Sequence, residues 1–111
     1  KDYNTVAPTV EAALQRFALG TYMVWYPRLA ARASHEAMVR RLRRLSPDNY
    51  LNVELDVCAR PSTGTGMYGS GLFIVNPPWT LPEELKIAMP YLVKRLGQDK
   101  SATHTLHHRI A

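Results

Sequence analysis

The stretch with the clearest chemical potential is residues 70–79, SGLFIVNPPW, in which an apolar run ends at Asn76, Pro77, Pro78 and Trp79. The run is typical of a buried strand, and two successive prolines end it because they cannot donate to a β-ladder. At such a strand end, the Asn76 side-chain oxygen and the Pro77 carbonyl could accept the hydrogens of an exocyclic amine, while the Trp79 ring stacks on the base. The sequence therefore predicts either a substrate cleft at these four residues or a simple strand terminator.

A second notable feature is a row of arginines on a helix predicted over residues 34–45. Apolar residues at helical spacing give this segment one buried face. The opposite face carries Arg40, Arg41, Arg43 and Arg44. Guanidinium groups match phosphate oxygens, so these four side chains are candidate RNA-binding residues; the simpler interpretation is the solvated face of a surface helix. The net charge of +5 permits a polyanionic partner without demonstrating one.

Two other patterns have weaker chemical interpretations. Glu54 and Asp56 share one side of an alternating strand predicted over residues 50–59, which suits acid–base chemistry or, as we favour, the exposed face of an outer strand. The glycines of residues 64–69 have the spacing of a dinucleotide-binding turn. A predicted strand follows them where that turn requires a helix, so we expect a long hairpin loop instead.

The histidines and the cysteine indicate neither a metal site nor a disulfide. His104, His107 and His108 have no acidic or cysteine neighbours, so we expect exposed histidines and no metal. Cys58 is the single cysteine, which favours a reducing, cytoplasmic setting. No apolar stretch reaches membrane-spanning length and no signal peptide is visible, so we expect no membrane partner. Because the sequence begins at Lys1 without Met, we expect a piece of something longer.

The first predicted strand is apolar throughout and follows a helix directly. A helix predicted over residues 8–19 leads directly into residues 21–26, from Thr21 to Tyr26, which are continuously apolar. Continuous apolar character is typical of a strand buried on both faces of a parallel sheet. Such a strand should pair on its open side with an upstream strand that this sequence does not contain, or with a second copy of the chain.

The rest of the chain predicts a mixed α/β sheet. Residues 50–59 and 70–75 form an antiparallel hairpin, and a helix over residues 81–96 contains Pro90, which should kink or split it. Residues 102–111 show weak alternation, which suits a last edge strand. A parallel strand, an antiparallel hairpin and flanking helices match the carboxyl-terminal half of a class I (Rossmann-like) methyltransferase sheet.

Two long motifs resemble one family closely. Residues 16–27, RFALGTYMVWYP, resemble the Arg-Phe-Ala-x-Gly-Thr-Tyr-x-x-Trp-Tyr-Pro segment of the RlmJ family of 23S ribosomal RNA adenine-N6 methyltransferases. Residues 66–79 resemble that family's Gly-Met…Ser-Gly-x-x-x-x-Asn-Pro-Pro-Trp segment, and residues 50–57 resemble its intervening strand. The similarity runs from about residue 1 to residue 97.

The resemblance implies that the whole protein is an enzyme. Residues 1–111 would be the carboxyl-terminal part of its S-adenosylmethionine-dependent methyltransferase domain. The family's catalytic Asp-Pro-Pro-Tyr ends an earlier strand, and Lys1-Asp2-Tyr3 looks like the remains of the stretch that follows it. The resemblance thus places all catalytic and cofactor-binding residues before residue 1, with ribosomal RNA as the partner. On its own this part should be inactive; the alternative is a standalone, non-catalytic RNA-binding module.

Overall fold

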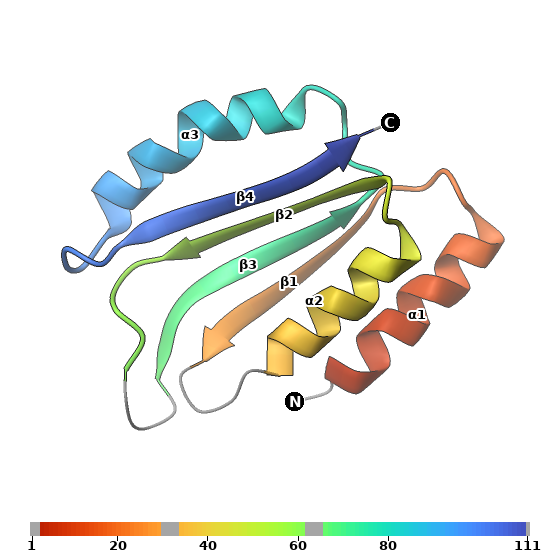
Figure 1. Ribbon diagram of the computed structural model, residues 1–111, viewed down its shortest axis with the longest axis horizontal. Coiled ribbons are helices and arrows are strands. Elements are labelled where there is room, and N and C mark those ends of the chain that lie inside the picture. Colours follow the sequence, from red (N-terminus) through yellow and green to blue (C-terminus); the bar gives the residue numbers. More distant parts are fainter. Residues whose placement is uncertain (1–2, 30–33, 62–65, 111) are drawn as a thin grey trace.

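The structure, a computed structural model, describes residues 3–29, 34–61 and 66–110, which form three helices and four strands. In chain order these are α1 (Tyr3–Arg16), β1 (Tyr22–Leu29), α2 (Ser34–Leu45), β2 (Asn49–Asp56), β3 (Met67–Val75), α3 (Leu81–Leu96) and β4 (Thr103–Ile110). The strands form one sheet in the order β1-β3-β2-β4 (Figure 1). No helix within the described ranges is long and apolar enough to cross a membrane.

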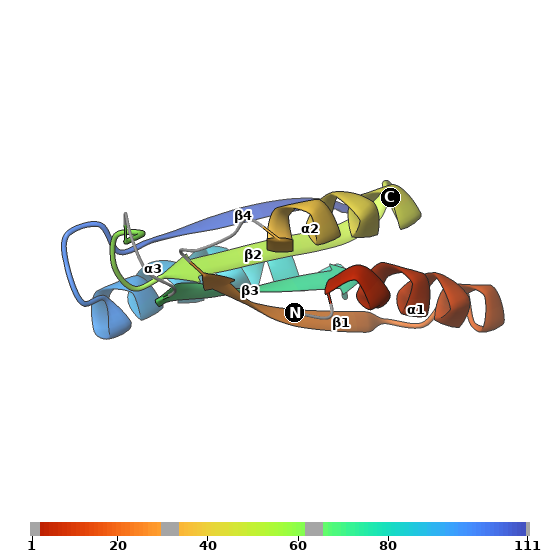
Figure 2. The same cartoon turned by 90° about the horizontal axis from the view of Figure 1, so that it is seen from below.

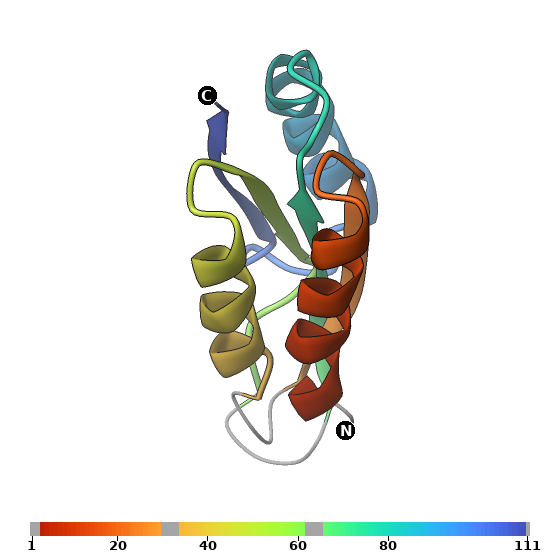
Figure 3. The ribbon, with the colours of Figure 1, turned by 90° about the vertical axis from the view of Figure 1, so that its right-hand side faces the viewer.

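Helices cover both faces of this sheet. Helices α1 and α2 pack side by side on one face and α3 packs on the other, as Figures 2 and 3 show from two further directions. Each face has its own core. Leu42 of α2 and Phe73 of β3 belong to the first, whereas Leu51 of β2 and Met89 of α3 belong to the second. The sheet is therefore the middle of three layers.

The predicted parallel, Rossmann-like arrangement is wrong for the described sheet. Every pair of neighbouring strands is antiparallel: β1 with β3, β3 with β2, and β2 with β4. The prediction failed because it took residues 21–26 as buried on both faces. In the structure β1 alternates: Tyr26 is fully buried, but Met23 and Trp25 are 63% and 59% exposed. Large apolar residues on an open face look the same in a sequence as buried ones.

Several observed helix and strand boundaries also differ from the predicted ones. Helix α1 runs from Tyr3 to Arg16 and not over the predicted residues 8–19, so Pro8 lies inside it. Strand β1 continues through Pro27 to Leu29, whereas the predicted strand ends at Tyr26. Proline is tolerated because β1 has a strand on only one side among the described residues. Helix α3 is one element that includes Pro90, and the predicted helix over 34–45 and the last edge strand are confirmed.

Candidate functional site

Polar side chains from β1 and β2 meet above two glycines of β3. Strand β3 lies between β1 and β2, so their side chains start about 10 Å apart, which is two strand spacings. Gly71 is the cross-strand partner of both Tyr26 and Glu54, and Gly69 is the partner of both Arg28 and Asp56. A methyl group at Gly71 would overlap the Tyr26 ring, and one at Gly69 would overlap the Asp56 carboxylate. The two glycines therefore allow side chains of β1 and β2 to meet across β3.

We call this group the cross-strand polar network. Its members are Tyr26, Arg28, His35, Asn52, Glu54 and Asp56. The Tyr26 hydroxyl donates to Glu54 Oε2 at 2.5 Å and accepts from Asn52 Nδ2 at 2.9 Å. Burial, together with the hydrogen bond to Glu54, raises the pKa of Tyr26. The hydroxyl is thus a fixed donor.

Arg28 joins both carboxylates of the network. Its Nε and Nη2 atoms donate to the two oxygens of Asp56 at 2.7 and 3.2 Å, and Nη1 donates to Glu54 Oε1 at 2.6 Å. The three side chains are only 17–18% exposed. The guanidinium also lies 5.1 Å from the centre of the Tyr68 ring. Our preferred interpretation of Glu54 and Asp56 as an exposed face of an outer strand is wrong, because β2 is an inner strand and both carboxylates are paired.

His35 completes the network from α2. Its ring is 2% exposed and stacks on Tyr26, with 5.5 Å between ring centres and 13° between planes. Its Nε2 atom lies 3.5 Å from Nη1 of Arg28. Burial and the charge of Arg28 lower the pKa of His35. The folded protein therefore favours the neutral form of this histidine.

His35 should make the protein less stable in acid. The unfolded chain takes up a proton near the ordinary histidine pKa of about 6.5, whereas folded His35 resists it, so the free energy of unfolding falls as pH drops below about 6.5. We expect His35→Phe, which keeps a ring against Tyr26 but cannot be protonated, to flatten this fall. Urea titrations at a series of pH values measure it, with the exposed His108→Gln as the control. An unchanged slope in His35→Phe would contradict the prediction.

Three of the predicted RNA-binding arginines surround a shallow hollow. Arg40, Arg43 and Arg44 line it together with Pro47, in a volume of about 280 Å³ at the end of α2. We call these four residues the arginine hollow. By helical spacing Arg41 lies on the other flank of α2, outside the hollow.

The arginines of α2 keep their charges available. All four side chains are exposed, and no carboxylate of the described residues forms an ion pair with any of them. The Arg43 guanidinium lies 4.9 Å from the centre of the Tyr50 ring, and that ring stacks on Phe73. The stacked Tyr50 ring thus positions the Arg43 guanidinium, which remains exposed and able to bind an anion.

The predicted cleft residues lie at the end of the sheet opposite the cross-strand polar network. The antiparallel strand β3 ends near the beginnings of β1 and β2, since Val75 is the partner of both Tyr22 and Tyr50. Just beyond it, the Asn76 amide donates to the carbonyls of Ala18 and Gly20 at 2.9 and 2.8 Å.

Asn76 also has a special backbone conformation. Its φ of 56° lies in the left-handed region, which asparagine adopts more readily than most residues. Through the two hydrogen bonds of its amide, Asn76 fastens the α1–β1 connection to the end of β3. Trp79 is 80% exposed and free to contact another molecule.

Sequence reasoning did not find the cross-strand polar network. The signal was present, since Tyr26 and Arg28 have the same two-residue spacing as Gly69 and Gly71. The tail histidines form no such cluster. Among the residues that the structure describes, no three His, Cys, Asp or Glu side chains are grouped to hold a metal ion.

Comparison with known proteins gives consistent matches. The chain matches the family described as "Ribosomal RNA large subunit methyltransferase D, RlmJ" over residues 1–109. It is 37% identical over 106 residues to "Ribosomal RNA large subunit methyltransferase J" of Haemophilus influenzae, covering 95% of this chain and 37% of that protein. The Escherichia coli protein of the same name is 33% identical over 95 residues, covering 86% and 33%.

A solved structure shares the fold. A crystal structure of a Legionella pneumophila protein has a TM-score of 0.84 at 30% sequence identity, covering 97% of this chain and 39% of that protein. The class defined by these matches is that of proteins related to large-subunit ribosomal RNA methyltransferases. The chain belongs to the RlmJ family, as its two motifs predicted. It spans about a third of the length of the curated relatives it matches.

Proposed function

We propose that this chain is the carboxyl-terminal part of a methyltransferase domain that acts on adenine N6 of 23S ribosomal RNA in the cytoplasm. Membership of the RlmJ family carries this proposal, because two relatives are named as ribosomal RNA large subunit methyltransferases. S-adenosylmethionine is the methyl donor that the family implies. The catalytic and donor-binding residues belong to the rest of the enzyme.

The glycines and carboxylates around the cross-strand polar network do not fit a donor site. A site for an adenosyl cofactor needs a glycine-rich turn and a carboxylate for the ribose. Here Gly69 and Gly71 are covered by Asp56 and Tyr26, and both Asp56 and Glu54 are paired with Arg28. The chain should therefore supply structure and RNA contacts, and it should need no metal.

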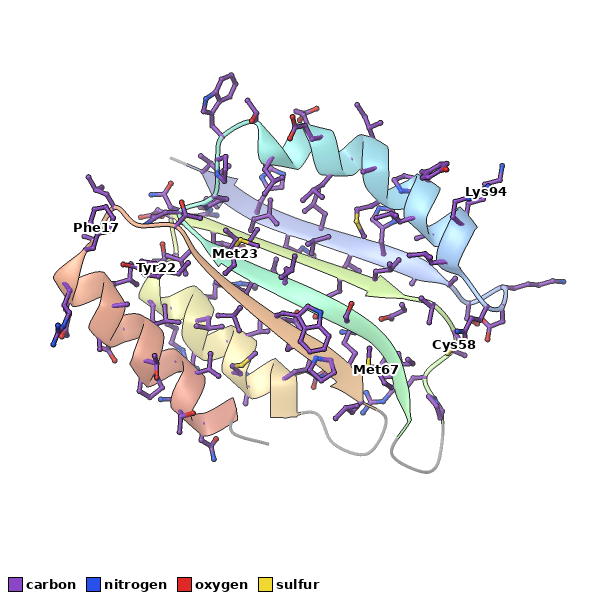
Figure 4. All side chains as sticks on the ribbon, turned by 180° about the vertical axis from the view of Figure 1, so that it is seen from behind. Phe17, Tyr22, Met23, Cys58, Met67 and Lys94 are labelled. Carbon is purple, nitrogen blue, oxygen red and sulfur yellow. The ribbon has the colours of Figure 1, made fainter. Side chains whose placement is uncertain are left out.

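The open side of β1 supports a further contact with the rest of the enzyme, or with a second copy. Strand β1 has no neighbour beyond it among the described residues. Its exposed Met23 lies on the face of the sheet that α3 covers (Figure 4), and the exposed Trp25, two residues further along the strand, lies on the same face. Beside them lies an apolar hollow of about 300 Å³ whose lining includes Trp25, Leu72 and Leu85. Exposed apolar surface next to an unpaired strand edge favours docking of another polypeptide segment.

A chimera tests the methyltransferase proposal directly. This chain would replace the matching segment of the Haemophilus influenzae relative, and methyl transfer from labelled S-adenosylmethionine to large-subunit ribosomal RNA would be measured. We expect a folded chimera to methylate the RNA and the 111-residue chain alone to show no turnover. A chimera that is folded by circular dichroism, binds the donor and still transfers no methyl group would overturn the proposal.

The second candidate function is a non-catalytic RNA-binding module. The exposed α2 arginines, Arg40, Arg41, Arg43 and Arg44, favour it because they have no carboxylate partner among the described residues. In either function we propose these four as RNA contacts, and Asn76, Pro77, Pro78 and Trp79 as a substrate-facing edge. Turnover by the chimera separates the two functions, since the module predicts RNA binding without it.

A further inference from the structure

Strand β4 places a second basic side chain next to the arginine hollow. Arg109 of β4 is the cross-strand partner of Tyr50, and His107 is the partner of Asn52. Cross-strand partners share a face of the sheet, so Arg109 and His107 lie on the face covered by α2. The Arg43 guanidinium already lies over the Tyr50 ring. Arg43 and Arg109 therefore flank the same aromatic residue from two different elements.

The charge of Arg109 is largely available to a ligand. Its side chain is 69% exposed, and its one ion-pair partner among the described residues is Asp48, at 4.0 Å and 73% exposed. An exposed pair at that distance contributes little and exchanges easily for a phosphate. His107 is exposed next to it along β4 and can donate a hydrogen bond from its ring.

We infer that β4 is the second wall of an RNA-binding surface that begins at the arginine hollow. The partner is ribosomal RNA, whose phosphates contact Arg43 on α2 and Arg109 and His107 on β4, with Tyr50 between them. This inference rests on the proposed RNA contact of α2 and extends it across the sheet. It gives the last strand, whose role the motifs left open, a function in binding.

Salt dependence of RNA binding tests the inference. We would titrate the chain with a short fluorescein-labelled single-stranded RNA of mixed sequence and measure anisotropy at several salt concentrations. Each lost phosphate contact should reduce the slope of log affinity against log salt by about 0.7. We expect this reduction, with a severalfold loss of affinity, in both Arg43→Glu and Arg109→Glu. Asp48→Asn, which removes the competing carboxylate, should strengthen binding.

Lys94→Glu is the charge-matched control. Lys94 is exposed on α3, on the other face of the sheet (Figure 4), and its substitution changes the net charge by the same amount. If Arg109→Glu behaves like Lys94→Glu while Arg43→Glu weakens binding, β4 is not part of the surface and the inference is wrong, although the α2 contact stands. If the unmodified chain ignores RNA at low salt, the proposed RNA contact itself fails.

Discussion

Replacing Gly71 with alanine should lower the free energy of unfolding by about 2–3 kcal/mol, the upper part of the range of about 1–3 kcal/mol expected when an extra group is forced into a packed site. The Tyr26 ring occupies the space where a side chain at position 71 would lie. Tyr26 is fully buried and bonded to Glu54 and Asn52, so it cannot move aside without losing those contacts. Urea unfolding followed by circular dichroism measures the loss.

Two further variants make this result specific to the Tyr26 ring. Gly66→Ala is the matched control, because the nearest atom to its added methyl group is Pro61 Cγ at 3.8 Å. We expect it to change stability by less than about 0.5 kcal/mol. In a Tyr26→Leu background, Gly71→Ala should cost clearly less than in the natural sequence, because the ring is gone. Equal costs in both backgrounds would show that the ring does not lie over Gly71.

Local patterns predicted the elements well where one face of a helix or strand was polar. Helix α2 has apolar residues at helical spacing and arginines opposite them, and its observed bounds match the prediction. Strand β1 was harder, because Met23 and Trp25 on the open face are as apolar as the buried Tyr26. The prediction of a parallel sheet followed from that one ambiguity, since the sequence carries no direct signal of strand direction.

The candidate site could be predicted only in part, because its residues meet through long-range pairing. The arginines of α2 are neighbours in sequence, so their clustering was visible from spacing alone. Tyr26 and Glu54 are far apart in the chain and meet only because β3 lies between their strands with Gly71 beneath them. Asn76 shows another limit: its motif left a substrate cleft and a strand terminator both open, and neither interpretation contained the hydrogen bonds by which its amide fastens the α1–β1 connection.

Arg28→Met should lower the free energy of unfolding by about 3 kcal/mol, the low end for removing one partner of a buried ion pair. The low end applies because the three side chains keep 17–18% of their surface exposed. Methionine fills most of the volume but leaves Glu54 and Asp56 next to each other without a cation. Arg28→Lys should lose less, since an ammonium keeps the charge but cannot form the paired bonds to Asp56.

The unpaired carboxylates are the cause of this loss, and removing their charge should reverse much of it. We expect the triple variant Arg28→Met, Glu54→Gln, Asp56→Asn to be more stable than Arg28→Met alone, because neutral amides are less costly to bury than unpaired charges. The exposed Arg40→Met is the control for losing an arginine, with an expected change within about 0.5 kcal/mol. Thermal and urea unfolding would report all three. A triple variant no more stable than Arg28→Met would show that Arg28 stabilises the fold by packing on Tyr68 and not by neutralising two carboxylates.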